Sequence, residues 1–180
     1  NEAYNYFMSY LIPEDQLKIF EFNRLVSSLN NLDPESFLIA LDEYYKIENR
    51  GQDYFKPSAK HEFSMYLEGE FYSLILRKKA YEFTDALSEL DAQVLYKTIL
   101  NPILGIKDLR NDKRIAYVQG QKDMAYVKGA VDQGSYVVGF GMYPTSVSEI
   151  KTIADEGLVM PPKTTYIDPK LRSGICIYEF

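Results

Sequence analysis

The residues best suited to chemistry gather near the carboxyl end of the sequence, in residues 160–174. This segment holds three prolines, three basic side chains and one acidic side chain, within a chain whose net charge is −6. Lysine offers a compact charge, and arginine can hold a carboxylate or phosphate through two hydrogen bonds. We therefore predict an anion-binding loop. Its candidate ligand-binding side chains are Lys163, Thr164, Thr165, Lys170, Arg172 and Ser173.

A stiff, solvated turn is the alternative interpretation of residues 160–174, because prolines rigidify a loop and lysines keep it hydrated. The segment is not a P-loop, since Lys163 has no flanking glycines and the loop leads into a predicted strand rather than a helix. Asp168 is its most suggestive acid, because basic neighbours favour the ionised form of a carboxyl group.

Four further candidates for ligand binding lie at the ends of predicted strands: Asn23, Arg24, Lys113 and Arg114. The last two belong to a charged run, residues 108–114, which is equally typical of a solvated loop whose ion pairs contribute little. We predict that residues 160–174 are ordered against the sheet, and that Lys163 and Arg172 face a shared pocket near Arg114.

Residues 143–146 form a weaker candidate site for an anion. They follow an apolar strand and open a helix, and helix N-termini favour negative charge. Capping of the helix by Ser146 and Glu149 explains the same residues without any ligand.

Several classes of function conflict with the composition. A single cysteine and a single histidine rule out an intrachain disulfide and a zinc site of the Cys/His kind. The net charge of −6 disfavours binding to nucleic acid or to anionic membranes. No apolar run approaches the roughly 20 residues that span a membrane. We expect a cytoplasmic protein with no metal, and an exposed His61 in a polar loop.

Hydrophobic periodicity and turn residues predict the elements that must position these side chains. We expect strands over residues 3–12, 17–26, 63–67, 70–76, 113–118, 136–143 and 175–180. We expect helices from Asp33, over residues 89–100 and 121–132, and from Ser146 to Gly157. Residues 49–60 are expected to form a mobile loop.

The order of these elements predicts a fold that mixes helices with a sheet. Glu68 and Gly69 separate two apolar runs, which predicts a tight antiparallel hairpin with Gly69 at positive φ. The second half alternates strand and helix in a βαβαβ-like order, which favours at least one parallel pair of strands. We therefore predict α+β or α/β, with a mixed sheet, flanking helices and a single domain over residues 1–180, excised from a longer protein.

Several motifs resemble an uncharacterised prokaryotic family, the domain of unknown function ten-fifteen. They fall at residues 22–26, 101–106, 112–115, 143–146, 160–165 and 169–174, so that the resemblance covers nearly the whole chain. In this family the residue at Thr164 is more often serine. The resemblance implies that this chain is the C-terminal part of a longer protein. The missing upstream half would carry an Asp-Gly-His-His-Arg motif. That motif is similar to motifs of the ParB and sulfiredoxin-like superfamily. Members of this superfamily handle nucleotides and include a kinase acting on free serine.

Two hypotheses about function follow. In the first, the domain helps to bind a nucleotide or phosphorylated metabolite, with any catalysis completed by the upstream half, so that this fragment alone is inactive. In the second, it is a non-catalytic module that senses a metabolite or docks a protein partner.

Overall fold

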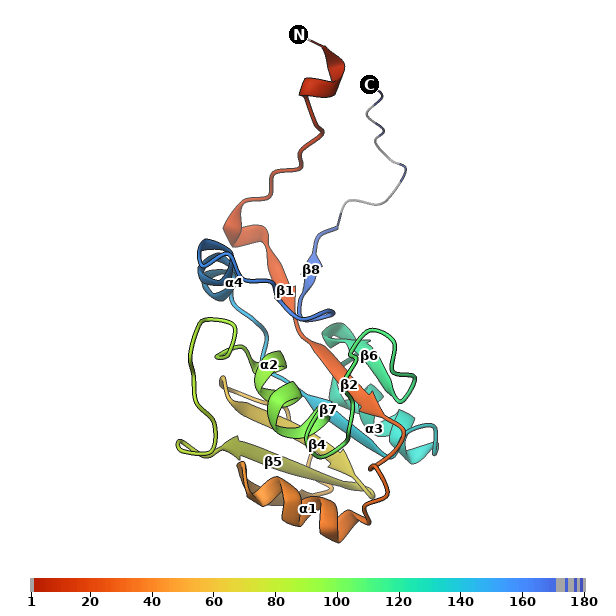
Figure 1. Cartoon of the computed structure of the whole chain (residues 1–180). Coiled ribbons are helices and arrows are strands. Elements are labelled where there is room, and N and C mark those ends of the chain that lie inside the picture. The colour runs from red at the N-terminus through yellow and green to blue at the C-terminus, as the bar shows by residue number, and fades with distance from the viewer. Residues whose placement is uncertain (1, 171–173, 175–176, 178, 180) are drawn as a thin grey trace.

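A computed structural model describes residues 2–170, 174, 177 and 179 of the chain, and its main feature is a six-stranded sheet (Figure 1). The strand order is β3-β5-β4-β7-β2-β6, and every strand pairing in the described part of the chain is antiparallel. The strands of this sheet are β2 (Phe22–Val26), β3 (Tyr45–Gly51), β4 (Glu62–Leu67), β5 (Glu70–Leu76), β6 (Ile115–Gln119) and β7 (Val138–Gly141).

A second, two-stranded sheet joins a segment near the N-terminus to a segment near the C-terminus. It pairs β1 (Lys18–Phe20) with β8 (Tyr166–Asp168), and β1 runs almost directly into β2. The segment that follows α4 is thereby held against the strand that enters the main sheet (Figure 1).

Helices cover both faces of the main sheet. They are α1 (Pro34–Asp42), α2 (Asp91–Leu95), which continues as a π-helix (Tyr96–Leu100), α3 (Asp123–Asp132) and α4 (Val147–Asp155); short 3-10 turns lie at Ala3–Asn5, Glu14–Gln16 and Gly120–Lys122. Residues of α1, α2 and the π-helix pack into the larger hydrophobic cluster, which includes Val26. The smaller cluster joins α3 to the opposite face through Leu25, since adjacent strand residues point to opposite faces.

The strand β7 lies in the middle of the sheet, as its apolar sequence predicted. Its glycines leave room for side chains of α3 to pack closely against it. A Cβ atom at Gly139 would collide with Val127, and one at Gly141 would lie 2.5 Å from Met124 Sδ. The sequence predicted close approach by another backbone, whereas the approaching groups are side chains of a helix.

The α+β class, the flanking helices and the hairpin are confirmed. The predicted parallel pair is wrong, because β2 separates β6 from β7 and runs antiparallel to both. Alternation of strand and helix gives a parallel pair only when the successive strands lie side by side in the sheet, and here the N-terminal strand β2 lies between β6 and β7.

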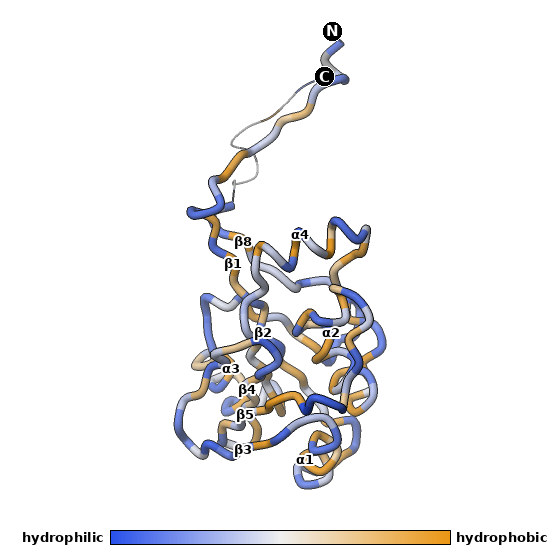
Figure 2. The backbone as a smooth tube through the Cα atoms, turned by 90° about the vertical axis from the view of Figure 1, so that its left-hand side faces the viewer, coloured by the Kyte–Doolittle hydropathy of each residue, from blue (hydrophilic) through white to orange (hydrophobic). Residues whose placement is uncertain are grey.

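Other predicted boundaries also differ from the structure. Residues 3–12 form no strand: they carry a 3-10 turn and then an extended segment with exposed side chains such as Phe7 (84%) and Leu11 (87%). Figure 2 shows this segment projecting away from the body. The strand β3 occupies part of the predicted loop over residues 49–60, because its half-buried, charged sequence pairs with β5. The predicted strand over residues 175–180 lies largely outside the described residues.

Among the described helices, none combines the length and the apolar character needed to cross a membrane.

The hairpin turn offers a test of backbone conformation. Glu68 and Gly69 both have positive φ, and a Cβ atom at Gly69 would meet nothing within 4 Å. We predict that Gly69→Val lowers the free energy of unfolding by about 1 kcal/mol or more, because a β-branched residue resists positive φ. The urea midpoint measures this change.

Gly129 in α3 provides the matched control, since a Cβ atom there also meets nothing but the backbone is helical. Gly129→Ala should raise the free energy of unfolding by about 0.5–1 kcal/mol. An unchanged midpoint for Gly69→Val would show that the turn does not need glycine.

Candidate functional site

The side chain of Arg24 lies inside the protein, in the middle of β2. Only 1% of the residue is exposed. Its Nη1 donates a hydrogen bond to the carbonyl of Phe22 (2.5 Å), and its Nη2 donates to the carbonyl of Lys163 (2.9 Å). The guanidinium lies over the ring of Tyr117, 4.5 Å from its centroid. These contacts connect the central sheet, its edge strand β6 and the segment before β8.

The charge of Arg24 is not neutralised by any described carboxylate, because none lies within 4 Å of its guanidinium. Burial lowers the pKa of Arg24 to about 10, and the side chain therefore stays protonated at neutral pH. Buried charges are normally paired, so carbonyl dipoles and an aromatic face are the compensation that the described residues provide here.

The tail loop, residues 160–168, is ordered against this arginine. Thr164 is buried, and its hydroxyl donates to the carbonyl of Pro161 (2.6 Å). Lys163 has positive φ, and its exposed ammonium lies 5.6 Å from the centroid of the Phe22 ring. The pairing of β8 with β1 fixes the far end of the loop.

A pocket of about 280 Å³ opens beside the tail loop, at the edge strand β6. We call it the Lys122–Lys163 pocket. Two ammonium groups and three aromatic rings border it, and no carboxylate among the described residues does. Lys122 Nζ lies 4.6 Å from the centroid of the Tyr126 ring. Its lining residues are Phe22, Tyr117, Val118, Gln119, Lys122, Tyr126 and Lys163.

Of the predicted site residues, Lys163 lines this pocket, and several others lie beside it in β2 and the tail loop. Arg24, Lys163 and Thr164 meet around the tail loop. Asn23 is buried beneath, where its Oδ1 accepts the N–H of Met142 (3.4 Å) and so extends the ladder between β2 and β7. Thr165 is half-buried in the same loop.

Other predicted residues lie elsewhere. Arg114 does not border the pocket: its guanidinium donates to Asp112 and to the carbonyls of Leu104 and Gly105, which braces the preceding loop. Lys113 is exposed.

Lys170 stacks on Tyr166, 4.6 Å from the ring centroid. Arg172 and Ser173 lie outside the described residues, and the proposed partnership of Lys163 with Arg172 therefore stays a prediction.

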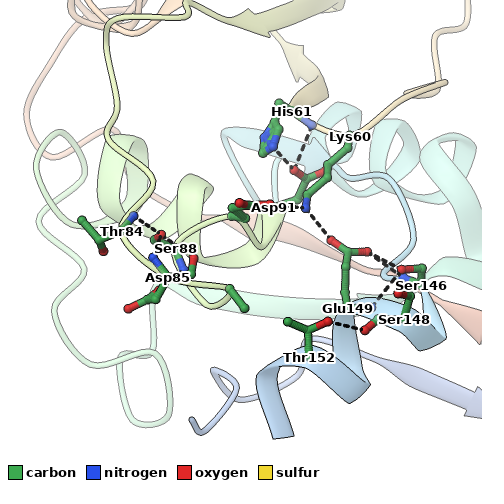
Figure 3. A network of polar contacts seen from close by, with 12 residues as sticks. Lys60, His61, Thr84, Asp85, Ser88, Asp91, Ser146, Ser148, Glu149 and Thr152 are labelled. Atoms are coloured by element: carbon green, nitrogen blue, oxygen red, sulfur yellow. Dashed lines mark hydrogen bonds and ion pairs between the residues drawn. The ribbon is translucent and has the colours of Figure 1, made fainter. Parts of the chain in front are cut away.

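A second polar cluster surrounds Asp91, the first residue of α2 (Figure 3). Only 8% of its side chain is exposed. Its Oδ1 accepts the backbone N–H of His61 (2.9 Å) and lies 3.7 Å from His61 Nδ1. The other oxygen, Oδ2, is buried without a hydrogen-bond partner among the described residues.

Burial determines the protonation of this pair. It raises the pKa of Asp91 to about 7. Burial also lowers the pKa of His61, and the charge of nearby Lys60 lowers it further. At neutral pH the imidazole is therefore uncharged, so that His61 and Asp91 are not a salt bridge.

Two adjoining cavities, of about 350 and 320 Å³, lie near this cluster, and Asp91 lines the smaller one; we call them together the Asp91 groove. They share Lys60, Ser146 and Glu149. Lys60 Nζ lies 2.8 Å from Glu149 and 3.5 Å from Glu89. Glu149 also completes the predicted capping box with Ser146 at the start of α4.

Sequence reasoning missed most of this cluster. His61 was expected to be exposed, yet its side chain is only 24% exposed and its φ is positive. Asp91 has the appearance of an ordinary first-turn acid, and no local signal marks its burial. Residues 143–146 were predicted as a weak candidate, and they do line part of the Asp91 groove. Across the described residues, no three His, Cys, Asp or Glu side chains gather as metal ligands.

Comparison with known proteins identifies the family. Residues 1–93 match the family described as "Protein of unknown function (DUF1015)", which is more than half of the 180-residue chain. The chain belongs to this family, and the predicted resemblance to an uncharacterised family is confirmed. No curated protein matches the sequence.

Two solved structures share a distant similarity with the chain. One is a free serine kinase mutant in complex with AMP, with 16% identity and a TM-score of 0.48, covering 85% of this chain and 54% of the kinase. The other is a conserved hypothetical protein from Pyrococcus furiosus, with 14% identity and a TM-score of 0.47, covering 85% of this chain and 56% of that protein. The chain thus spans about half the length of each.

The buried Asp91 predicts a pH-dependent stability. Its pKa of about 7 in the folded chain exceeds the ordinary value of 3.8, so the folded state binds the proton more tightly. The stability contributed by protonated Asp91 is present below about pH 4 and is lost as pH rises to about 7. We predict that the free energy of unfolding of Asp91→Asn, relative to that of the parent chain, increases as pH rises from about 4 to about 7. Urea titrations at several pH values measure this difference.

His61 supplies a control of opposite sign. Because the pKa of His61 is lowered in the folded chain, the contribution of His61 to the free energy of unfolding falls as pH drops below about 6.5. His61→Asn, which tolerates positive φ, should therefore gain relative stability toward low pH. A difference between Asp91→Asn and parent that does not vary with pH would contradict a buried carboxyl with a raised pKa.

Proposed function

We propose that this chain binds a small anionic molecule, a nucleotide or another phosphorylated metabolite, in the Lys122–Lys163 pocket. The observation that carries the proposal is the pocket's lining. Two lysines and three aromatic rings meet there without a described carboxylate, although the protein has a net charge of −6. A local cationic site in an acidic protein favours a specific anion over general attraction to polyanions.

The charges support binding of phosphate groups at one side of the pocket. The ammonium groups of Lys122 and Lys163 can approach phosphate oxygens as point charges. Arg24 lies behind the Tyr117 ring and adds a buried positive charge that no described carboxylate cancels. Because buried charges are screened less than exposed ones, Arg24 strengthens the positive potential in the pocket.

The aromatic rings support a flat organic group beside the phosphate. Phe22, Tyr117 and Tyr126 border the pocket, and stacking of a base on an aromatic side chain contributes about 1–3 kcal/mol. A volume of about 280 Å³ suits a mononucleotide or a smaller metabolite that is partly exposed to solvent.

The proposal concerns binding rather than a reaction. The described lining of the pocket holds no histidine, cysteine or carboxylate that could act as a general base or nucleophile. Any catalysis would need groups from outside this pocket, as the resemblance to a longer family member implies. A metabolite sensor without catalytic activity is the second candidate, and the same lining supports it.

Binding can be tested by isothermal titration of the 180-residue chain with AMP, ADP and ribose 5-phosphate, with adenosine as the uncharged counterpart. We predict that the phosphorylated compounds bind and that adenosine binds at least about tenfold more weakly, because the lysines meet the phosphate. Lys163→Ala and Lys122→Ala should each weaken binding about three- to tenfold and reduce its salt dependence.

Lys113→Ala is the matched control, since Lys113 is exposed and does not border the pocket. It should leave the affinity unchanged. If Lys113→Ala weakened binding as much as Lys163→Ala, or if adenosine bound as well as AMP, the proposed pocket would be wrong. Binding without turnover of ATP or ADP would favour the sensor over an enzyme part.

A further inference from the structure

The Asp91 groove differs in charge from the Lys122–Lys163 pocket. Apart from Lys60, the charged groups that line it are carboxylates, counting only described residues. These acids come from the segment before α2, from α2 itself, from α4 and from the residue that follows α4: Asp85, Glu89, Asp91, Glu149 and Glu156. We propose that the Asp91 groove is a second binding site, which takes a small molecule with a protonated amino group.

The partners of Lys60 leave acidic charge unbalanced in the groove. Its ammonium is shared between Glu149 (2.8 Å) and Glu89 (3.5 Å), so one cation serves two carboxylates. Asp91 is not within ion-pair distance of that ammonium. A ligand cation would complete the charge balance of the groove.

The buried oxygen of Asp91 identifies the hydrogen-bonding partner. Oδ2 is buried and unpartnered although Asp91 lines the cavity, and a buried acceptor without a donor is costly. An ammonium group offers three donors and a positive charge, whereas a hydroxyl offers one donor and no charge. Hydroxyls of Thr145 and Ser146, on the same cavity, can accept from the remaining N–H groups.

Binding of an ammonium should be linked to release of a proton. The pKa of Asp91 is raised to about 7, and a cation beside the carboxylate favours its ionised form. The charged groups around Asp91 are Lys60 and His61 before β4, Glu89 before α2, and Glu149 on α4. Two tyrosines also lie near it, Tyr45 of β3 and Tyr143 after β7. The affinity for an amine should therefore rise as pH increases from about 5 to about 7.

His61 makes the groove directly observable. It is the single histidine of the chain, and its Nδ1 lies 3.7 Å from Asp91 Oδ1. We expect titration with putrescine or ethanolamine, at constant ionic strength, to shift the His61 ring signals in proton NMR to a saturable limit. Their uncharged counterparts, 1,4-butanediol and ethylene glycol, should bind at least about tenfold more weakly because they lack the charge.

Three variants locate the effect. Asp91→Asn should weaken amine binding about tenfold or more, and should abolish proton release measured by titration in buffers of different ionisation enthalpy. Glu89→Gln changes an exposed side chain and leaves the core intact, and it should weaken amine binding about two- to threefold. Glu35→Gln on α1 lies away from the groove and should leave amine binding unchanged.

Some outcomes would overturn the proposal even if Asp91→Asn failed to fold. They are equal binding of putrescine and 1,4-butanediol to the parent chain, or displacement of putrescine by an equal concentration of magnesium chloride. A third is a shift of the His61 signals that grows linearly without saturation. These measurements need no phosphorylated ligand, so their result is independent of the Lys122–Lys163 pocket.

Discussion

The position of Arg24 is the constraint on which the arrangement of this chain depends. Its guanidinium reaches the carbonyl of Lys163, stacks on Tyr117 and lies wholly within the protein, so it connects the centre of the sheet to the edge strand β6 and to the tail loop. A lysine would not reproduce this arrangement, because its compact ammonium lacks the flat guanidinium plane that stacks on the ring while its N–H groups donate to two carbonyls. The tail loop is therefore held by the same residue that gives the neighbouring pocket its buried positive charge.

The protein separates its charges into two sites of opposite character. The Lys122–Lys163 pocket gathers ammonium groups and aromatic rings at the sheet edge, while the Asp91 groove gathers carboxylates between α2 and α4 (Figure 3). A buried group whose charge is incompletely compensated accompanies each cavity: Arg24 lies behind the Tyr117 ring beside the first, and Asp91 lines the second. Since such groups are costly to bury, their presence at two cavities is more typical of ligand sites than of a core built only for stability.

The sequence was sufficient for features that depend on local rules. The hairpin at Glu68 and Gly69, the cap at Asp33 and the capping box at Ser146 all follow from side-chain chemistry within a few residues. Prediction from the sequence failed where tertiary contacts determine the structure. Strand β3 has a charged sequence that does not by itself indicate a strand. The order of β6, β2 and β7 depends on pairing between segments that are distant in the chain. Arg24 and Lys163 were predicted from their types, whereas the burial of Asp91 has no local signature.

The place of β7 in the sheet has a consequence for the way the chain folds. Residues 138–141 lie between β2 and β4, which both precede them by more than seventy residues. The segment that matches the family, residues 1–93, therefore contains two groups of strands that do not pair with one another, β1–β2 and β3–β5. During synthesis, the continuous six-stranded sheet cannot form until β7 has been made, because β7 pairs with both β2 and β4. Closing such long loops makes folding slow, and an N-terminal fragment that stops before Val138 would lack β7 and would expose unpaired strand edges prone to aggregation.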